Sequence, residues 1–146
     1  MDADTFVERS KAVATVVLTS QQLFKAIGKM ARRYELTQSQ FNALRVLRGA
    51  GRRGEELTQA ELADRLIASR ANTTWILDRL EERKLVRRKP HPDRRKHLVE
   101  LTRQGREMLT RLDPEFEAFL NSVLGGVSQK ELASITTILS KFKFSV

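Results

Sequence analysis

The segment of residues 57–102 constrains the fold of this chain more than any other. Residues 59–66 and residues 69–83 each have the spacing of a short helix, and only a tight turn separates them. Residues 85–89 and 97–101 flank a proline-containing basic loop, and the second flank alternates apolar and polar positions as a half-buried strand does. We therefore expect two short helices followed by a β-hairpin.

Helix starts elsewhere in the chain are marked by capping boxes. In this motif a hydroxyl and a side chain three residues later satisfy backbone amides that the first helical turn leaves unpaired. The motif occurs three times, at Thr37–Gln40, Thr58–Glu61 and Ser128–Glu131. We predict helices over about residues 5–34, 38–48, 59–66, 69–83, from the cap at Thr102 onward, and from 129, with a loop at 49–54 and a kink or break at Pro114.

Composition limits the class of protein. The chain has 146 residues, 40% of them hydrophobic and 31% charged, which is typical of a soluble globular protein. Its apolar run at residues 12–18 is too short to span a membrane, and no export signal is apparent, so we expect a cytoplasmic protein with no membrane association. The absence of cysteine excludes disulfides, thiolate metal sites and cysteine redox switches.

Positive charge is concentrated in one part of the chain. The formal net charge is +9, and residues 45–111 hold 18 Lys and Arg against 10 Asp and Glu, so they carry eight of the nine excess charges. Such a local excess is typical of a surface that binds a polyanion, although a solvated charged face is the simpler alternative. Because the excess coincides with the helices and hairpin, we favour nucleic acid.

The amino end of the predicted helix at 69–83 has side chains suited to reading bases. A short helix fits the major groove, where Arg binds guanine and Asn binds adenine in bidentate fashion. Thr can reach a phosphate or a thymine methyl group, and a single exposed Trp can pack against the sugar-phosphate chain or lie half-buried against the hairpin. The candidates, which could also be ordinary cap and surface residues, are Ser69, Arg70, Asn72, Thr74 and Trp75.

The hairpin provides a second candidate contact with the duplex. Its cations can bind the phosphate backbone or enter a minor groove, and Asp93 can accept hydrogen bonds that hold the tip in shape. The alternative is a solvated basic loop. The candidates are Arg88, Asp93, Arg94, Arg95 and Lys96.

These motifs together resemble the MarR family of winged helix-turn-helix regulators. The resemblance rests on residues 69–74, on 76–81 with 85–86, and on 93–95 followed by Leu101, Thr102 and Gly105. It implies a mainly α fold with a small β-hairpin wing. Residues 37–102 would form the winged helix-turn-helix, and residues 5–34 and 103–146 a helical dimerisation region within one MarR-like domain. A homodimer would repress transcription by binding a palindromic operator in double-stranded DNA.

The resemblance also implies an effector and shows one departure. Many members of the family release DNA when a small aromatic or anionic molecule binds between the dimerisation and winged regions. Met30, Tyr34, Phe41, Arg45 and His97 could line such a cleft, although a plain core or surface role fits them as well. Lys84 stands where many members have glycine, so we expect this turn either to hold a non-glycine residue in left-handed conformation or to close differently.

Other functions are less well supported by the residues. His91 and His97 have no partner at metal-ligand or nucleophile spacing, and the chain has no glycine-rich phosphate loop. We therefore expect no catalytic residues, no metal and no cofactor, and hence no enzyme. A winged helix that binds RNA or protein without operator specificity is the alternative, but the aromatic residues follow helical core stripes and do not form a stacking surface.

Overall fold

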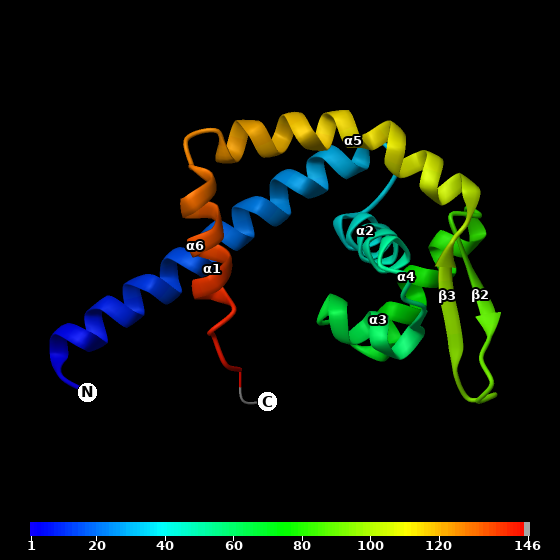
Figure 1. Cartoon of the computed structure of the whole chain (residues 1–146), viewed down its shortest axis with the longest axis horizontal. Helices are drawn as coiled ribbons and strands as arrows, with labels where there is room; N and C mark the ends of the chain where they lie inside the picture. Colours follow the sequence, from blue (N-terminus) through cyan, green and yellow to red (C-terminus); the bar gives the residue numbers. More distant parts are fainter. Residues whose placement is uncertain (145–146) are drawn as a thin grey trace. The chain divides into compact units, whose positions relative to one another are not determined.

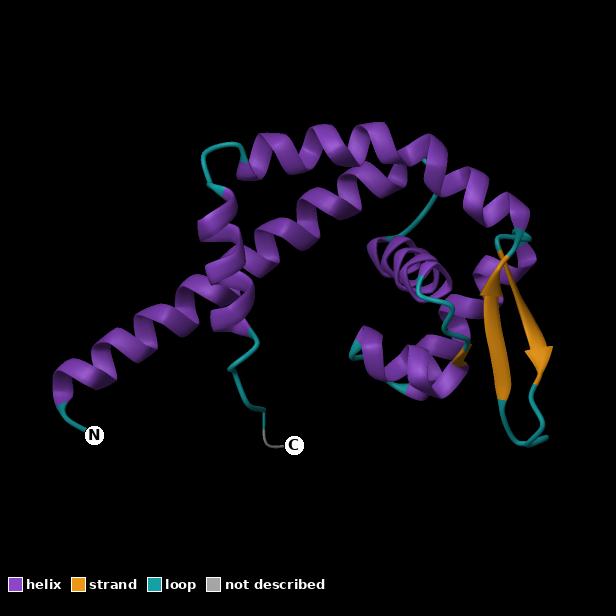
Figure 2. Cartoon of the chain, in the orientation of Figure 1, coloured by secondary structure: helices purple, strands orange, loops and turns teal. Residues whose placement is uncertain are grey.

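The computed structural model describes residues 1–144 and confirms the predicted fold class, a mainly α chain with a small antiparallel sheet (Figures 1 and 2). The chain divides into two compact units, one of residues Met1–Leu112 and one that begins at Asp113. The elements in order are α1 (Ala3–Arg32), α2 (Gln38–Arg52), β1 (Leu57–Thr58), α3 (Gln59–Leu66), α4 (Arg70–Glu82), β2 (Val86–Pro90), β3 (His97–Leu101), α5 (Arg103–Leu124) and α6 (Gln129–Leu139).

The capping boxes fix three helix starts as predicted. Thr37 begins α2, Thr58 begins α3 and Ser128 begins α6, and at each of them both hydrogen bonds of the box are present. The glutamate of the last two boxes has a pKa below its usual value, because the backbone amide of the cap residue donates a hydrogen bond to its carboxylate. These caps explain why the helix starts are legible in the sequence.

The core of the first unit lies between α2, α3, α4, the sheet and the first half of α5. α4 contributes one apolar face at helical spacing, while α2 packs against α1, α3, α4 and β3. The largest fully buried side chains are those of Leu36, Phe41, Leu44, Leu62, Thr73, Ile76, Leu77, Leu80, Val86, Leu109 and Leu112.

The sheet has three antiparallel strands in the order β1-β3-β2. β2 and β3 form the predicted hairpin, with Val86 opposite Leu101 and Pro90 opposite His97. The short strand β1 was not predicted; there Leu57 pairs with Val99. Thr58 both ends this strand and caps α3, so the capping signal concealed the strand in the sequence.

The predicted loop at residues 49–54 is wrong, because α2 continues to Arg52. The additional turn buries Ala50, and this burial stabilises the helix by more than Gly49 and Gly51 destabilise it. The helix ends where Gly54 takes a φ of 69°, a left-handed conformation that glycine adopts without steric cost. Pro114 does not divide α5. Lys84 has a φ of 57°, so the turn after α4 closes with a left-handed residue, which is the first of the two possibilities that the sequence left open.

The start of α5 is joined tightly to the end of α4. The Thr102 hydroxyl donates to the Lys84 carbonyl at 2.5 Å and accepts from the Gly105 N–H at 3.1 Å, which confirms Thr102 as the cap. The Thr102 N–H donates to the Leu85 carbonyl at 3.1 Å. A Cβ atom on Gly105 would lie 2.1 Å from that same carbonyl oxygen, so glycine is required by the close approach of two backbones.

We predict that Gly105→Ala lowers the free energy of unfolding by about 1–3 kcal/mol, because the backbone at Leu85 must move to admit the methyl group. Gly51→Ala is the matched control, since a Cβ at Gly51 meets nothing within 4 Å and alanine favours the helix. Urea unfolding followed by circular dichroism measures both. Equal stability of the two variants would contradict the close approach.

The second unit contains the later part of α5 and all of α6. Within it the rings of Phe116 and Phe119 stack at a centroid distance of 6.0 Å. Several large apolar side chains of this unit are exposed, namely Leu120, Val123, Ile135, Ile138 and Leu139.

Candidate nucleic-acid interface

The amino end of α4 is an exposed, capped helix start. The Ser69 hydroxyl accepts a hydrogen bond from the Asn72 N–H at 3.1 Å, as an N-cap does. The side chain of Arg70 is 62% exposed, and its guanidinium lies 3.6 Å from the Asp64 carboxylate. Among the described residues, the side-chain amide of Asn72 has no hydrogen-bond partner. Two side chains that can read bases therefore extend from the same helix end.

Thr74 and Trp75 differ in how freely they can contact a ligand. The Thr74 hydroxyl donates to the Arg70 carbonyl at 3.0 Å and accepts from the Gln59 side-chain amide at 2.7 Å. Its hydrogen-bonding capacity is thus used inside the protein. Trp75 is 49% exposed, and the Arg79 guanidinium lies over its ring at 5.9 Å from the centroid. The indole is therefore a half-exposed surface group on the outer side of α4.

The turn between α3 and α4 holds an unusual residue. Ile67 has a φ of 51°, and it is 95% exposed. A β-branched side chain in the left-handed region is strained, because its Cβ crowds the neighbouring carbonyl. Nothing buried offsets this strain, so the turn is less stable than one built with asparagine or glycine.

We expect Ile67→Asn to raise the free energy of unfolding by about 1 kcal/mol, because asparagine tolerates the left-handed conformation. This gain in stability is not offset by lost packing, because the isoleucine side chain is almost fully exposed. Ile67→Val, which keeps the β-branch, should leave stability unchanged. Urea unfolding of the three proteins is the measurement, and a valine variant as stable as the asparagine variant would contradict the explanation.

The wing, defined here as the hairpin of β2, β3 and the loop between them, has an ordered tip. The Asp93 N–H donates to the His91 Nδ1 at 2.9 Å, and one Asp93 carboxylate oxygen accepts from the Arg95 N–H at 3.0 Å. The Asp93 carbonyl accepts from the Lys96 N–H at 3.0 Å. Asp93 therefore shapes the tip, and the side chains of Arg94, Arg95 and Lys96 are all exposed around it.

Arg88 is placed differently from the other wing cations. Its side chain is only 19% exposed and forms ion pairs with Asp78 and Glu81 of α4. The sequence suggested a contact with nucleic acid for Arg88, but the structure directs its guanidinium into the protein. The sequence analysis did not identify the partners of Arg88, which are Asp78 and Glu81 of α4 and Gln59 of α3. The sequence did contain a signal, because two carboxylates on a helix expected to approach a polyanion call for a nearby cation.

The five residues expected to line an effector cleft lie in different settings in the structure. Met30 and Phe41 are buried in the core, and Arg45 lies over the Phe41 ring at 5.7 Å from its centroid. His97 is at the far end of β3, beside a cavity of about 330 Å³ along the wing. Tyr34 is half-buried near the end of α1. These positions fit the core and surface roles that the sequence left open for the five residues.

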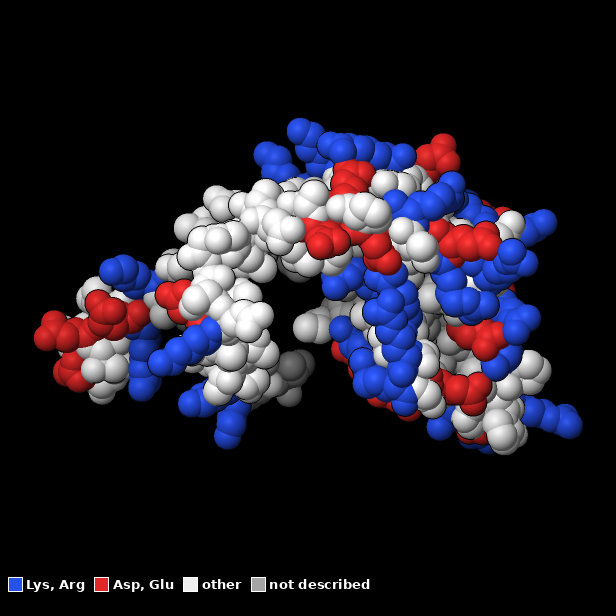
Figure 3. Space-filling model, turned by 45° about the horizontal axis from the view of Figure 1, so that its top comes forward, with Lys and Arg blue, Asp and Glu red and all other residues white. Residues whose placement is uncertain are grey.

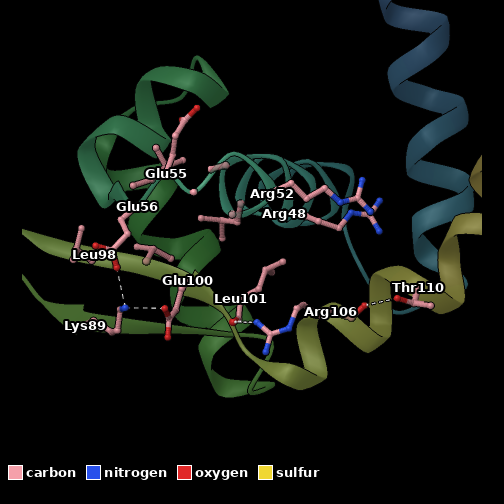
Figure 4. Close-up of a pocket in the computed structure, with 16 residues that line it drawn as sticks. Arg48, Arg52, Glu55, Glu56, Lys89, Leu98, Glu100, Leu101, Arg106 and Thr110 are labelled. Atoms are coloured by element: carbon pink, nitrogen blue, oxygen red, sulfur yellow. Dashed lines mark hydrogen bonds and ion pairs between the residues drawn. The ribbon is translucent and has the colours of Figure 1, made fainter.

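A cavity of about 640 Å³ lies between α2, the sheet and the first turns of α5 (Figure 4). Arg48 and Arg52 approach it from α2 and Arg106 from α5, where the Arg106 guanidinium donates to the Leu101 carbonyl at 2.9 Å. On the opposite side, Lys89 lies 2.8 Å from Glu100 and 3.0 Å from Glu56. The hydrogen bond with Glu100 raises the pKa of Lys89 and lowers the pKa of Glu100, so this pair stays charged.

Cations cover the surface of the first unit around the sheet (Figure 3). Many of them are paired with carboxylates, as Arg53 and Arg65 are with Glu55. Those two hydrogen bonds lower the pKa of Glu55 to about 2. Across residues 1–144 no helix is long and apolar enough to cross a membrane, and no cluster of three His, Asp or Glu side chains could hold a metal ion.

Known proteins share this architecture. The sequence profile of the MarR family matches residues 34–97. The HTH-type transcriptional regulator YdgJ of Bacillus subtilis (strain 168) is 30% identical over 135 residues, which cover 91% of this chain and 80% of YdgJ. The HTH-type transcriptional regulator PecS of Dickeya dadantii (strain 3937) is 27% identical over 141 residues, which cover 94% of this chain and 83% of PecS. The chain belongs to the MarR family.

A solved structure supports the same fold. A mutant MarR from E. coli, crystallised with operator DNA, matches with a TM-score of 0.77 at 24% identity and covers 97% of this chain and 98% of that chain. As a member of the MarR family, the chain is a transcriptional regulator of the winged helix-turn-helix class, and not an enzyme. The hairpin of β2 and β3 is the wing of this fold, and α4 is the second helix of its helix-turn-helix.

Proposed function

We propose that this MarR protein is a repressor that binds a palindromic operator as a homodimer. The observation that carries the proposal is the pairing of an exposed, base-reading helix end with an ordered basic wing tip in one compact unit. The helix end can enter a major groove, and the wing can reach the adjacent backbone or minor groove.

The two parts of this surface have different roles. Arg70 and Asn72 can distinguish bases, because their planar donor and acceptor groups match guanine and adenine. Arg94, Arg95 and Lys96 carry no such information when they neutralise phosphates, but they contribute affinity that depends on salt. The expected result is a protein whose wing sets affinity and whose helix sets sequence preference.

The direct test is selection of bound fragments from a random or genomic duplex library with the purified protein. Recovery of a palindromic sequence supports the proposal. Recovery of unrelated sequences, or equal binding to single-stranded RNA, contradicts it. The selected duplex then serves as the probe in the measurements that follow.

Replacing both wing-tip arginines, as in Arg94→Ala with Arg95→Ala, should weaken binding to every duplex and reduce the slope of log K against log salt by about 4 for the proposed homodimer, two for each protomer. The reason is that each arginine displaces counterions from a phosphate. Fluorescence anisotropy at several salt concentrations gives both quantities, and an unchanged slope would refute the wing contact.

Asn72→Ala serves as the contrasting variant. It should weaken binding to the selected duplex by a factor of about 5–100 and relax the preference at one base pair in each half-site, because a bidentate contact discriminates by about 1–3 kcal/mol. The salt slope should stay as in the parent. A uniform loss over all sequences would show that Asn72 does not read a base.

The proposed homodimer is supported by an apolar stripe on α1. Phe6, Val13, Val17 and Phe24 recur at helical spacing, and all four are large exposed side chains; Phe24, for example, is 55% exposed. A contiguous apolar stripe of this length on a monomer marks a protein–protein contact. We propose that the second copy covers it.

We expect Val17→Lys combined with Phe24→Lys to dissociate the dimer, because two buried charges at its centre would lack partners. Gln22→Lys adds a charge to an exposed polar position on the opposite face of the same helix and should leave the dimer intact. Sedimentation velocity measures the mass. A monomeric parent protein, or an intact dimer in the double variant, would contradict the proposed interface.

The proposal includes release of DNA by a small anionic effector. Its support is the cavity of about 640 Å³, where Arg52 and Arg106 approach the same space from two helices. Guanidinium groups suit carboxylate ligands, and the apolar side chains of Leu57 and Leu98 in the wall suit an aromatic ring. This cavity replaces the five-residue cleft expected from the sequence.

A further inference from the structure

Two neighbouring arginines of β2 differ sharply in their surroundings. Arg87 is 65% exposed and pairs with Glu100 of β3, whereas Arg88 is 19% exposed and points to α4. The two side chains lie on opposite faces of the strand, as successive residues of a strand do. Of these two arginines, Arg88 is therefore the one that connects the wing with α4.

Arg88 bonds to two carboxylates of α4. Its Nη1 lies 2.5 Å from Glu81 Oε2, and its Nη2 lies 2.7 Å from Asp78 Oδ1. The backbone N–H of Arg88 also donates to Glu81 Oε1 at 3.2 Å. Glu81 thus holds both the side chain and the backbone of the same strand residue, and the link fixes β2 against α4.

The hydrogen bonds continue from Arg88 to the base-reading end of α4. The Arg88 Nε donates to Gln59 Oε1 at 3.1 Å, and Gln59 Nε2 donates to the Thr74 hydroxyl at 2.7 Å. Thr74 lies one helical turn before Asp78 and donates to the Arg70 carbonyl at 3.0 Å. One guanidinium therefore connects the wing, the start of α3 and the first turn of the recognition helix.

We infer that Arg88 is a positioning residue for DNA recognition: it holds the wing and the recognition helix in one arrangement and neutralises Asp78 and Glu81, without contacting DNA. The inference rests on the proposed function. Without Arg88, two uncompensated carboxylates would remain on a helix that approaches a polyanion. Lysine could not replace it, because an ammonium group lacks the planar fork that reaches all three partners.

This link differs from an ordinary surface ion pair. Exposed pairs contribute little, because solvent screens them and the side chains lose entropy. Arg88 is largely buried, it has three side-chain acceptors on two elements, and charge-assisted hydrogen bonds of this length are the stronger class. Removal of one partner should therefore affect the arrangement of both elements.

The test compares Arg88→Gln with Arg87→Gln, which removes the same charge from the same strand without breaking the link. On the selected duplex, Arg88→Gln should raise Kd at least about tenfold and reduce the preference for that duplex over random sequence. Its salt slope should equal that of the parent, because no phosphate contact is lost. A slope lower by about 2 for the homodimer, one for each protomer, would show that Arg88 binds phosphate, and would overturn the inference.

A double-mutant cycle with Glu81→Gln makes the test independent of single-variant effects. If Arg88 neutralises Glu81, the loss of affinity from Arg88→Gln should be smaller in the Glu81→Gln background. If Arg88 acted on DNA directly, the loss would be equal in both backgrounds. Asp78→Asn breaks the link from the helix side at a half-exposed position, so it provides the same information should Arg88→Gln fail to fold.

Hydrogen exchange without DNA separates this inference from the proposed function. Amides of residues 70–82 should exchange faster in Arg88→Gln than in the parent, and Arg87→Gln should leave them unchanged. A parent protein that binds no duplex would refute the proposed function, and the exchange result would still stand. Equal exchange in both arginine variants would overturn the positioning role.

Discussion

The structure of the winged unit depends on a division of α4 into two faces. Thr73, Ile76, Leu77 and Leu80 are fully buried, and they fix the rotation of the helix about its own axis. Because a helix has 3.6 residues per turn, this rotation also decides that Arg70, Asn72 and Trp75 face solvent. Ser69 then sets where the helix begins, and therefore the position of the exposed residues along the helix axis. The base-reading surface is thus a consequence of core packing and one cap.

The face of an element on which a side chain lies also decides which charged groups of the winged unit remain accessible. A surface for a polyanion needs cations that remain accessible, yet α4 carries Asp78 and Glu81 close to that surface. Arg88, itself largely buried, removes this conflict by pairing with both half-exposed carboxylates, while the tip cations remain exposed around Asp93. Net charge along the sequence does not distinguish these two kinds of arginine. The distinction arises from strand alternation, which directs Arg88 to α4 and leaves Arg87 at the surface.

Local signals in the sequence were sufficient for most of the fold. The capping boxes at Thr37, Thr58 and Ser128 gave the helix starts, and the periodicity of α4 gave its buried face, because both depend on residues within one or two turns. Two features of the fold were not predicted, because distant contacts decide them. Ala50 extends α2 because it is buried, and β1 exists because β3 offers it a partner. The role of Arg88 depends on contacts 7 to 29 residues away, which no local pattern reveals.

The position of β2 connects the cavity with the recognition helix. Lys89 belongs to the lining of the cavity of about 640 Å³, where it pairs with Glu56 and Glu100, and the preceding residue Arg88 holds α4. An anion that competed for Lys89 would disturb the strand on one face and the Arg88 link on the other. The Arg88 link therefore joins the strand that borders the cavity to the first turn of α4, and the proposed effector would act on α4 through this strand.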